Sequence, residues 1–148
     1  MTKYLLLTLL MAELLQAQAY KVVYDCSSSD AIYIKSRMWL VGKTIDMMKE
    51  DGDESKVVLT LHGGCVAMVS KDYEMIVADE DVKHIKKAQE YLSKLSKRKN
   101  VKIIACEMSL ASNAIEKSEV LPFVHVSKNS FIDTIKYQNN GYALMAFK

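Results

Sequence analysis

The three cysteines of this 148-residue chain each follow a strand-like run rich in β-branched residues. The runs and their cysteines are Lys21–Asp25 with Cys26, Val57–Leu61 with Cys65 (after His62, Gly63 and Gly64), and Lys102–Ala105 with Cys106. In an open parallel sheet, ligands and chemistry gather at the carboxyl ends of the strands. If the three runs are parallel neighbours, the three thiols lie along one edge of the sheet.

Cys106 is the leading candidate for a nucleophile. It follows the most apolar of the three runs and precedes a short helix expected over Ser109–Lys117. A thiol near a helix N-terminus experiences the positive end of the helix dipole, which lowers its pKa and favours the thiolate. Such a thiolate could attack a sulfur donor and carry a persulfide. A buried, unreactive cysteine is the structural alternative.

The segment His62-Gly63-Gly64-Cys65 is a candidate binding pocket. Two glycines would let backbone amides approach a ligand or an anion closely. His62 could exchange a proton with Cys65 or with a bound group. The segment is not a phosphate loop, because no Gly-Lys-Ser/Thr sequence follows it. Its structural interpretation is a strand-to-helix turn.

Cys26 is followed by three serines and is either a turn residue or a disulfide partner. A Cys26–Cys106 disulfide would require the first and third strands to be adjacent and their Cα atoms to lie close together. Because the cysteine count is odd, at least one thiol cannot pair within the chain. The wide spacings contain no Cys-x-x-Cys motif, and we expect neither a metal nor another cofactor.

Residues 1–19 have the layout of a secretory signal peptide. Lys3 precedes an apolar run from Tyr4 to Ala12, and Ala17-Gln18-Ala19 is a small-x-small cleavage site. We expect cleavage after Ala19, which would leave an exported, periplasmic domain over residues 20–148 without a stable membrane span. An N-terminal amphipathic helix or an uncleaved anchor is the alternative, since Glu13 is unusual in a signal peptide. Export would favour oxidation of the thiols.

Strands and helices alternate through the rest of the chain. One apolar stripe predicts a helix after the first strand, with Ile34, Met38, Val41, Ile45 and Met48 at steps of three and four. A second helix opens with Asp79-Glu80-Asp81 and closes in a basic cluster over residues 94–99. That order of charges matches the helix dipole. Together with the net charge of +2, it leaves no reason to expect a nucleic-acid partner.

The C-terminal part adds a strand over Phe123–Val126, a helix from Asn129 or Ser130 to about Gln138, and a last strand over Tyr142–Phe147. Five strands separated by helices argue for a sheet that is covered on both faces. We therefore predict an α/β fold, in the form of one three-layer α/β/α sandwich with a mainly parallel five-stranded sheet.

Four segments, in this order, resemble the DsrE/DsrF-like family over about Lys21 to Lys148. They are the opening Lys-Val-Val-Tyr with its Ser-Ser-Asp turn, Val-Leu-Thr-Leu-His-Gly-Gly, Val-Lys-Ile-Ile-Ala-Cys106, and the closing Phe131-Ile-Asp-Thr-Ile-Lys-Tyr-Gln-Asn-Asn-Gly-Tyr-Ala-Leu. The resemblance implies an α/β/α sandwich, a homo-oligomer such as a trimer or hexamer and, for some members, sulfur transfer through a cysteine after the third strand. That role carries over to Cys106. The family's frequent glycine after this cysteine is replaced by Glu107, whose carboxylate would raise the pKa of the thiol.

The leading hypothesis is therefore an exported DsrE-like protein in a sulfur relay, with Cys106 as the persulfide carrier and a second protein as sulfur-transfer partner. His62 and Cys65 would shape the same pocket. The alternative is a non-catalytic, homo-oligomeric binding or assembly module in which the cysteines are structural.

Overall fold

The computed structural model describes residues 19–148. Residues 1–18, and with them nearly all of the expected signal peptide, lie outside the described residues. Five strands form one parallel sheet in the order β4-β3-β2-β1-β5. Their bounds are Ala19–Cys26 (β1), Glu54–Leu61 (β2), Val101–Cys106 (β3), His125–Ser127 (β4) and Ala143–Phe147 (β5).

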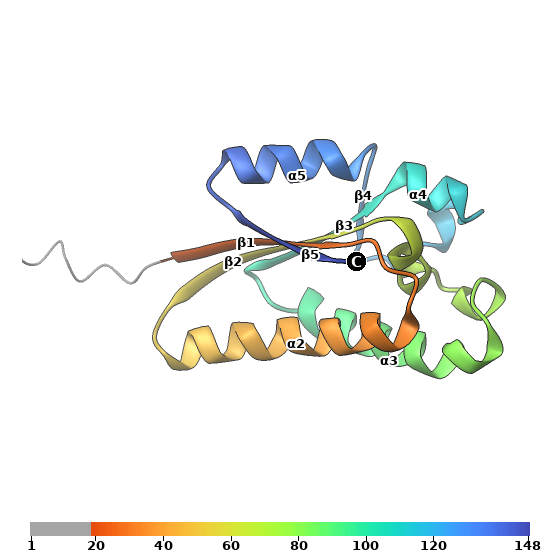
Figure 1. The fold of residues 1–148 in the computed structure, drawn as a ribbon, viewed down its shortest axis with the longest axis horizontal. Helices are drawn as coiled ribbons and strands as arrows, with labels where there is room; N and C mark the ends of the chain where they lie inside the picture. Colours follow the sequence, from red (N-terminus) through yellow and green to blue (C-terminus); the bar gives the residue numbers. More distant parts are fainter. Residues whose placement is uncertain (1–18) are drawn as a thin grey trace, which may run out of the picture.

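Helices cover both faces of this sheet, which confirms the predicted three-layer α/β fold. Helices α2 (Ala31–Glu50) and α3 (Asp79–Ser96) lie together on one face, and α5 (Ser130–Asn139) lies on the other (Figure 1). Helix α2 begins where the Asp30 side chain accepts a hydrogen bond of 2.9 Å from the Tyr33 N–H, a capping contact that satisfies a free donor of the first turn. In the described part of the chain, no helix is both long and apolar enough to cross a bilayer.

Alternation along the strands divides the core into two clusters. Val22, Tyr24 and Cys26 of β1 face the large cluster under α2 and α3. Val23 between them points to a small cluster with Val58 and Ile104, against which Tyr137 and Tyr142 pack. Because side chains of successive strand residues point to opposite faces, β1, β2 and β3 each contribute to both clusters. The same rule decides on which face each polar residue at the carboxyl edge lies.

The connections after β2 and β3 differ from the prediction. The segment after β2 is a buried 3₁₀ helix, η2 (Gly63–Val69), which already includes the two glycines expected to form a turn before a helix, and η3 (Tyr73–Met75) follows it. The helix expected over Ser109–Lys117 is α4 (Glu107–Ser112) and begins directly after Cys106. It ends early because Ala114 adopts a left-handed conformation (φ 54°), after which the Ile115 N–H donates a hydrogen bond of 2.9 Å to the Leu110 carbonyl oxygen. The 3₁₀ helix η4 (Lys117–Glu119) follows.

Candidate functional site

Four polar or reactive side chains gather at the carboxyl edge of the sheet on the face that carries α5. Asp25 lies two residues after Val23 in β1, Thr60 lies two after Val58 in β2, and Cys106 lies two after Ile104 in β3. His62 continues the alternation of Thr60 just beyond β2. Since β1, β2 and β3 are parallel neighbours, the fold brings these residues together from three separate segments.

Asp25 and His62 form a hydrogen-bonded pair. His62 Nε2 lies 3.1 Å from Asp25 Oδ2, and the Thr60 hydroxyl donates a hydrogen bond of 2.6 Å to Asp25 Oδ1. The hydrogen bond with Asp25 raises the pKa of His62 against the effect of burial, and the negative charges of Asp25 and Cys106 act in the same direction. Burial alone would raise the pKa of Asp25, but its hydrogen bonds with His62 and Thr60 outweigh burial and lower it.

Cys106 ends β3 and occupies the position that precedes the first turn of α4. The residue is only 4% exposed. Burial raises the pKa of its thiol, but hydrogen bonding from the backbone N–H groups and hydroxyls of Ser130 and Ser109 outweighs burial, and the net pKa is lowered. These donors stabilise the thiolate, because hydrogen bonding to the charged form of a group favours that form.

Glu107, which stands next to Cys106, is paired with a cation. Its carboxylate Oε1 forms an ion pair of 2.8 Å with Lys117 Nζ. The positive charge of Lys117 offsets the negative charge next to the thiol. The direction of the pKa shift of Cys106 is set by Ser130 and Ser109, which lower it.

Apolar side chains flank the solvent side of the site. The Phe131 ring meets the His62 ring edge-on at a centroid distance of 5.7 Å, and Phe131 is 65% exposed. It belongs to the first turn of α5, where the Asn129 side chain accepts a hydrogen bond from the Phe131 N–H. Met108, two residues after Cys106, is exposed as well. A partner or substrate that reaches Cys106 would thus meet an apolar rim.

The two glycines of the expected pocket pack against the chain itself. The Gly63 N–H donates to Ser109 Oγ at 3.0 Å, and the Gly64 N–H donates to the Ser27 carbonyl oxygen at 3.3 Å. A Cβ atom at Gly64 would lie 2.6 Å from Ser29 Cα, closer than real atoms approach. Both amides are therefore occupied, and the close packing of backbone explains the glycines as a strand-to-helix turn.

The disulfide joins Cys26 to Cys65, whose Cα atoms are 5.9 Å apart. A Cys26–Cys106 bond, which the sequence left open, is wrong for two reasons. Strand β2 separates β1 from β3, and Cys26 faces the α2/α3 cluster whereas Cys106 lies on the α5 face. For the same reason Cys65 does not share a pocket with His62 on the α5 face. Cys106 is left as the free thiol of the described chain.

The sequence analysis missed Asp25, Thr60 and Ser130. The sequence does contain an indication of Asp25 and Thr60, because each is a polar residue within a mainly apolar strand. Charged residues are rarely buried without a partner. A carboxylate at Asp25, near the end of the mainly apolar run Val-Val-Tyr-Asp-Cys, therefore indicates that a partner side chain lies close to it. Ser130 lies 24 positions after Cys106 in the chain, and only the packing of α5 on the sheet brings it to the thiol.

The fold is a parallel α/β sandwich with a buried cysteine at the carboxyl edge of the sheet. The sequence profile described as "DsrE/DsrF-like family" matches residues 21–147, and the chain belongs to this family. A relative named "Uncharacterized protein", from Aquifex aeolicus (strain VF5), is 33% identical over 131 residues. That match covers 88% of this chain and 57% of the relative, so the chain spans little more than half of the relative's length.

A solved structure supports the fold independently. It is the protein of unknown function MTH1491 from Methanobacterium thermoautotrophicum, with a TM-score of 0.64 and 18% identity. The likeness covers 86% of this chain and 99% of the other. At this level of identity it establishes the arrangement of strands and helices and carries no statement about chemistry.

Proposed function

We propose that the protein carries sulfane sulfur as a persulfide on Cys106. The membership in the DsrE/DsrF-like family suggests a sulfur-relay-related fold. The observation that carries the proposal is the grouping of Cys106 with the Asp25–His62 pair on one face of the sheet, where hydrogen-bond donors lower the pKa of the thiol. A thiolate next to a protonated imidazole is the usual form of a nucleophilic cysteine.

The transfer step needs no external oxidant. The Cys106 thiolate attacks the outer sulfur of a donor persulfide, R–S–SH, so that a new bond forms between Cys106 Sγ and that sulfur. The S–S bond of the donor breaks, and the inner sulfur leaves as the thiolate R–S⁻, which takes the proton of His62 and departs as R–SH. The new persulfide on Cys106 then gives its own proton to His62. The products are R–SH and an anionic Cys106 persulfide beside a protonated imidazole.

Asp25 has a positioning role in this scheme. Its carboxylate fixes the imidazole of His62 and stabilises the protonated ring, and Thr60 fixes the carboxylate in turn. The donors of Ser109 and Ser130 stabilise negative charge at the sulfur before and after the transfer. The apolar rim of Phe131 and Met108 would receive a donor or acceptor protein that brings its own sulfur to the edge of the site.

The proposal includes export to an oxidising compartment such as the periplasm. The Cys26–Cys65 disulfide supports this location, because structural disulfides persist outside the cytoplasm. The signal-peptide layout of residues 1–19 supports it as well. A free thiol in such a compartment requires protection, and the burial of Cys106 provides it.

Homo-oligomeric assembly is a second candidate function, favoured by exposed apolar residues along α5 and β5. Ile132 and Ile135 on α5 and Leu144 and Met145 on β5 are between 41% and 57% exposed. Strand β5 is also an edge strand, with one side of its backbone unpaired. Patches of this kind on a small domain mark interaction sites. Sedimentation at micromolar concentration tests this candidate, and a monomer that persists at all concentrations would refute it.

Cyanolysis tests the carrier function. The purified protein is incubated with a small-molecule persulfide, freed of excess donor and treated with cyanide, which removes sulfane sulfur as thiocyanate. We expect about one thiocyanate per chain from the wild type and none from Cys106→Ser. Equal release from both proteins, or none from the wild type, would refute Cys106 as the carrier.

A further inference from the structure

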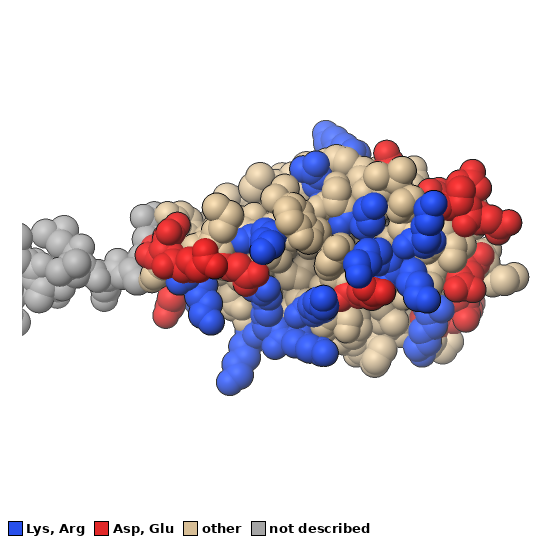
Figure 2. Space-filling view, turned by 90° about the horizontal axis from the view of Figure 1, so that it is seen from below, with Lys and Arg blue, Asp and Glu red and all other residues tan. Residues whose placement is uncertain are grey.

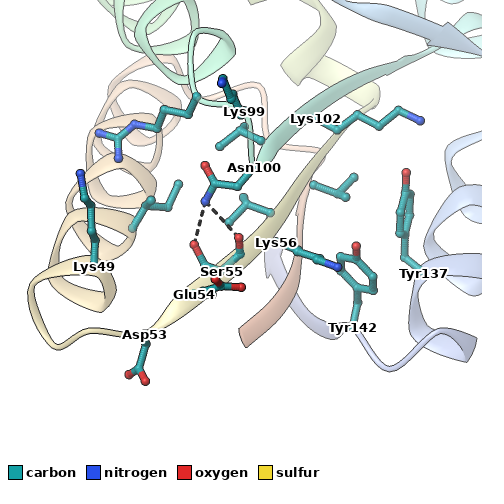
Figure 3. Close-up of a pocket in the computed structure, with 15 residues that line it drawn as sticks. Lys49, Asp53, Glu54, Ser55, Lys56, Lys99, Asn100, Lys102, Tyr137 and Tyr142 are labelled. Atoms are coloured by element: carbon teal, nitrogen blue, oxygen red, sulfur yellow. Dashed lines mark hydrogen bonds between the residues drawn. The ribbon is translucent and has the colours of Figure 1, made fainter. Parts of the chain in front are cut away.

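A cavity of about 720 Å³ lies at the amino edge of the sheet, opposite the edge that holds Cys106. It surrounds the first residues of β2 and β3 (Figure 3). Five basic residues contribute to its lining, namely Lys49, Lys56, Arg98, Lys99 and Lys102. The carboxylates in the lining are those of Asp53 and Glu54, and Figure 3 shows the Asp53 side chain pointing away from the lysines. Positive charge is therefore in excess around this cavity.

The lysines of the cavity lack partners among the described residues. Arg98 is bound to Asp46, with 2.6 Å between Nη1 and Oδ1. Within residues 19–148, no ion pair involves Lys49, Lys56, Lys99 or Lys102. Basic side chains also spread over the α2/α3 face (Figure 2). Lys49 and Lys99 lie at or just after helix C-terminal ends, where the helix dipole favours positive charge.

Lys56 and Lys102 have no such explanation, because they lie on strands. Both belong to the α5 face, two residues before Val58 and Ile104 respectively. Lys102 is in register with Val58, so it is the diagonal neighbour of Lys56, and Lys21 of β1 is directly opposite Lys56. Like charges on neighbouring strands repel one another. The three exposed lysines give this part of the sheet face a local excess of positive charge.

Two tyrosines complete this side of the cavity. The rings of Tyr137 and Tyr142 pack edge-to-face at 5.0 Å, and both line the cavity. Lys21 is already engaged, since its Nζ lies 6.0 Å from the centre of the Tyr142 ring and donates to the Asn140 carbonyl oxygen. The Tyr142 and Tyr137 side chains stand beside Lys56 and Lys102 in Figure 3. Helix α5 ends at Asn139, and this part of the sheet face is left open.

The floor of the cavity is fixed by hydrogen bonds. The Asn100 side chain donates to both the carbonyl oxygen and the hydroxyl of Ser55, at 3.0 and 2.9 Å. The Asn100 carbonyl oxygen in turn accepts from the Val57 N–H at 2.9 Å. The backbone that carries Lys56 is thereby tied to the segment that carries Lys99 and Lys102.

We propose that this cavity is a binding site for a phosphate-bearing ligand with several negative charges. Lys56 and Lys102 would contact the phosphate oxygens, Lys49 and Lys99 would add attraction from the other side of β2 and β3, and the tyrosine rings would pack against the rest of the ligand. Lysine ammonium groups bind phosphate as point charges, and multivalent anions gain from several at once. The site is separate from Cys106 and independent of sulfur transfer.

Calorimetric titration of the wild-type protein with inorganic pyrophosphate tests the proposal. We expect saturable binding that weakens as salt is added, because exposed charges are screened. The double variant Lys56→Gln/Lys102→Gln should weaken binding about tenfold or more. Lys83→Gln/Lys128→Gln is the matched control, since it removes the same charge from exposed positions outside the cavity. It should bind like the wild type.

Vesicles distinguish a soluble ligand from a lipid headgroup. Sedimentation with phosphatidylglycerol vesicles, but not with phosphatidylcholine vesicles, and its loss in Lys56→Gln/Lys102→Gln would assign the phosphate to a lipid. Binding of pyrophosphate alone would assign it to a soluble ligand. Absence of both, or an equal loss in the two double variants, would overturn the proposal.

Discussion

His62 Nε2 lies 3.1 Å from Asp25 Oδ2, and this contact joins the ends of β1 and β2 on the face of the sheet where Cys106 lies. Asp25 is two residues after Val23, which packs under α5, and His62 directly follows β2. The pair places an imidazole of raised pKa on the same face as a thiol whose own pKa is lowered by Ser130 and Ser109. The carboxyl edge of the sheet thus combines the three groups that the proposed transfer uses: a thiol, an imidazole and the carboxylate that holds the imidazole.

Replacement of Asp25 by Asn should slow the reaction of Cys106. Without the carboxylate, the pKa of His62 falls, so a smaller fraction of the imidazole carries the positive charge that interacts with Cys106. We expect the rate of alkylation by iodoacetamide at neutral pH to fall by about tenfold, which corresponds to about 1.4 kcal/mol. The rate should be followed across pH, and its midpoint should move upward.

Asp51→Asn is the control for this measurement, because Asp51 is an exposed carboxylate next to the C-terminal end of α2, at the other edge of the sheet. It should alkylate like the wild type. If Asp25→Asn and the wild type showed the same midpoint, the Asp25–His62 pair would have no influence on the thiol.

The same pair predicts how stability depends on pH. The pKa of Asp25 is lowered in the folded state, so its contribution is present above the unfolded value, about 4, and is lost as pH falls through the folded value. The pKa of His62 is raised, so its contribution is complete below about 6.5 and is lost as pH rises through the folded value. The pair therefore stabilises most between about pH 4 and 6.5.

Chemical denaturation across this range measures the effect. In that window Asp25→Asn should lower the free energy of unfolding by about 1–3 kcal/mol, since it leaves a poorly partnered, largely buried imidazole. The difference from the wild type should shrink on both sides of the window. A difference that stayed constant from acid to alkaline pH would show that the loss has another cause.

Reduction of the Cys26–Cys65 disulfide should destabilise the protein without activating or blocking Cys106. The bond closes a loop with a sequence separation of 39, for which chain entropy predicts about 4 kcal/mol of stabilisation. Denaturation with and without reductant measures this difference. Under non-reducing, denaturing conditions one thiol per chain should react, and its peptide should contain Cys106. Recovery of Cys26 or Cys65 as the reactive thiol would contradict the pairing.

Substitution of Gly64 by Ala tests how closely the turn from β2 into η2 is packed, and Gly42 and Gly52, which lie outside this turn, serve as comparisons. Gly64→Ala should cost about 2 kcal/mol, because its Cβ would lie 2.6 Å from Ser29 Cα. Gly42→Ala lies within α2, where the nearest atom to a new Cβ is 4.0 Å away, and should stabilise by up to about 1 kcal/mol. Gly52→Ala meets no atom within 4 Å and should show only the cost of its positive φ, about 1 kcal/mol. Thermal unfolding of the three variants would reveal a different order if Gly64 were not closely packed.

Most of the fold could be predicted from local sequence patterns. The stripe from Ile34 to Ile45 and the charge order of α3 are periodic signals, and the apolar runs of β1, β2 and β3 are consistent with a buried parallel sheet. The boundaries of α4 could not be predicted, because the helix is ended by the left-handed conformation of Ala114 and the hydrogen bond from the Ile115 N–H to the Leu110 carbonyl oxygen, which leave no periodic pattern in the sequence. Strand β4, at His125–Ser127, is also short and displaced from the predicted Phe123–Val126.

The candidate site was only partly predictable, since its parts come from distant segments. Cys106 could be chosen from its place after a strand and before a helix, and His62 from its place after β2. Asp25 could not be predicted as the partner of His62. The strand order β3-β2-β1 and the pairing of Asp25 with Thr60 across two strands exist only in the folded sheet. The pairing of the cysteines could not be predicted for the same reason, because the face that Cys26 occupies depends on the alternation of side chains along β1 in the folded sheet.

Intact mass measurement of the protein after incubation with a small persulfide donor tests the carrier function most directly. The wild type should gain the mass of one sulfur atom per chain, and a reducing thiol should remove it. Cys106→Ser should gain nothing, and Asp25→Asn should gain the same mass more slowly. A wild type that stays at its original mass, or a Cys106→Ser variant that gains the sulfur atom as fast as the wild type, would contradict the role of Cys106 as the persulfide carrier.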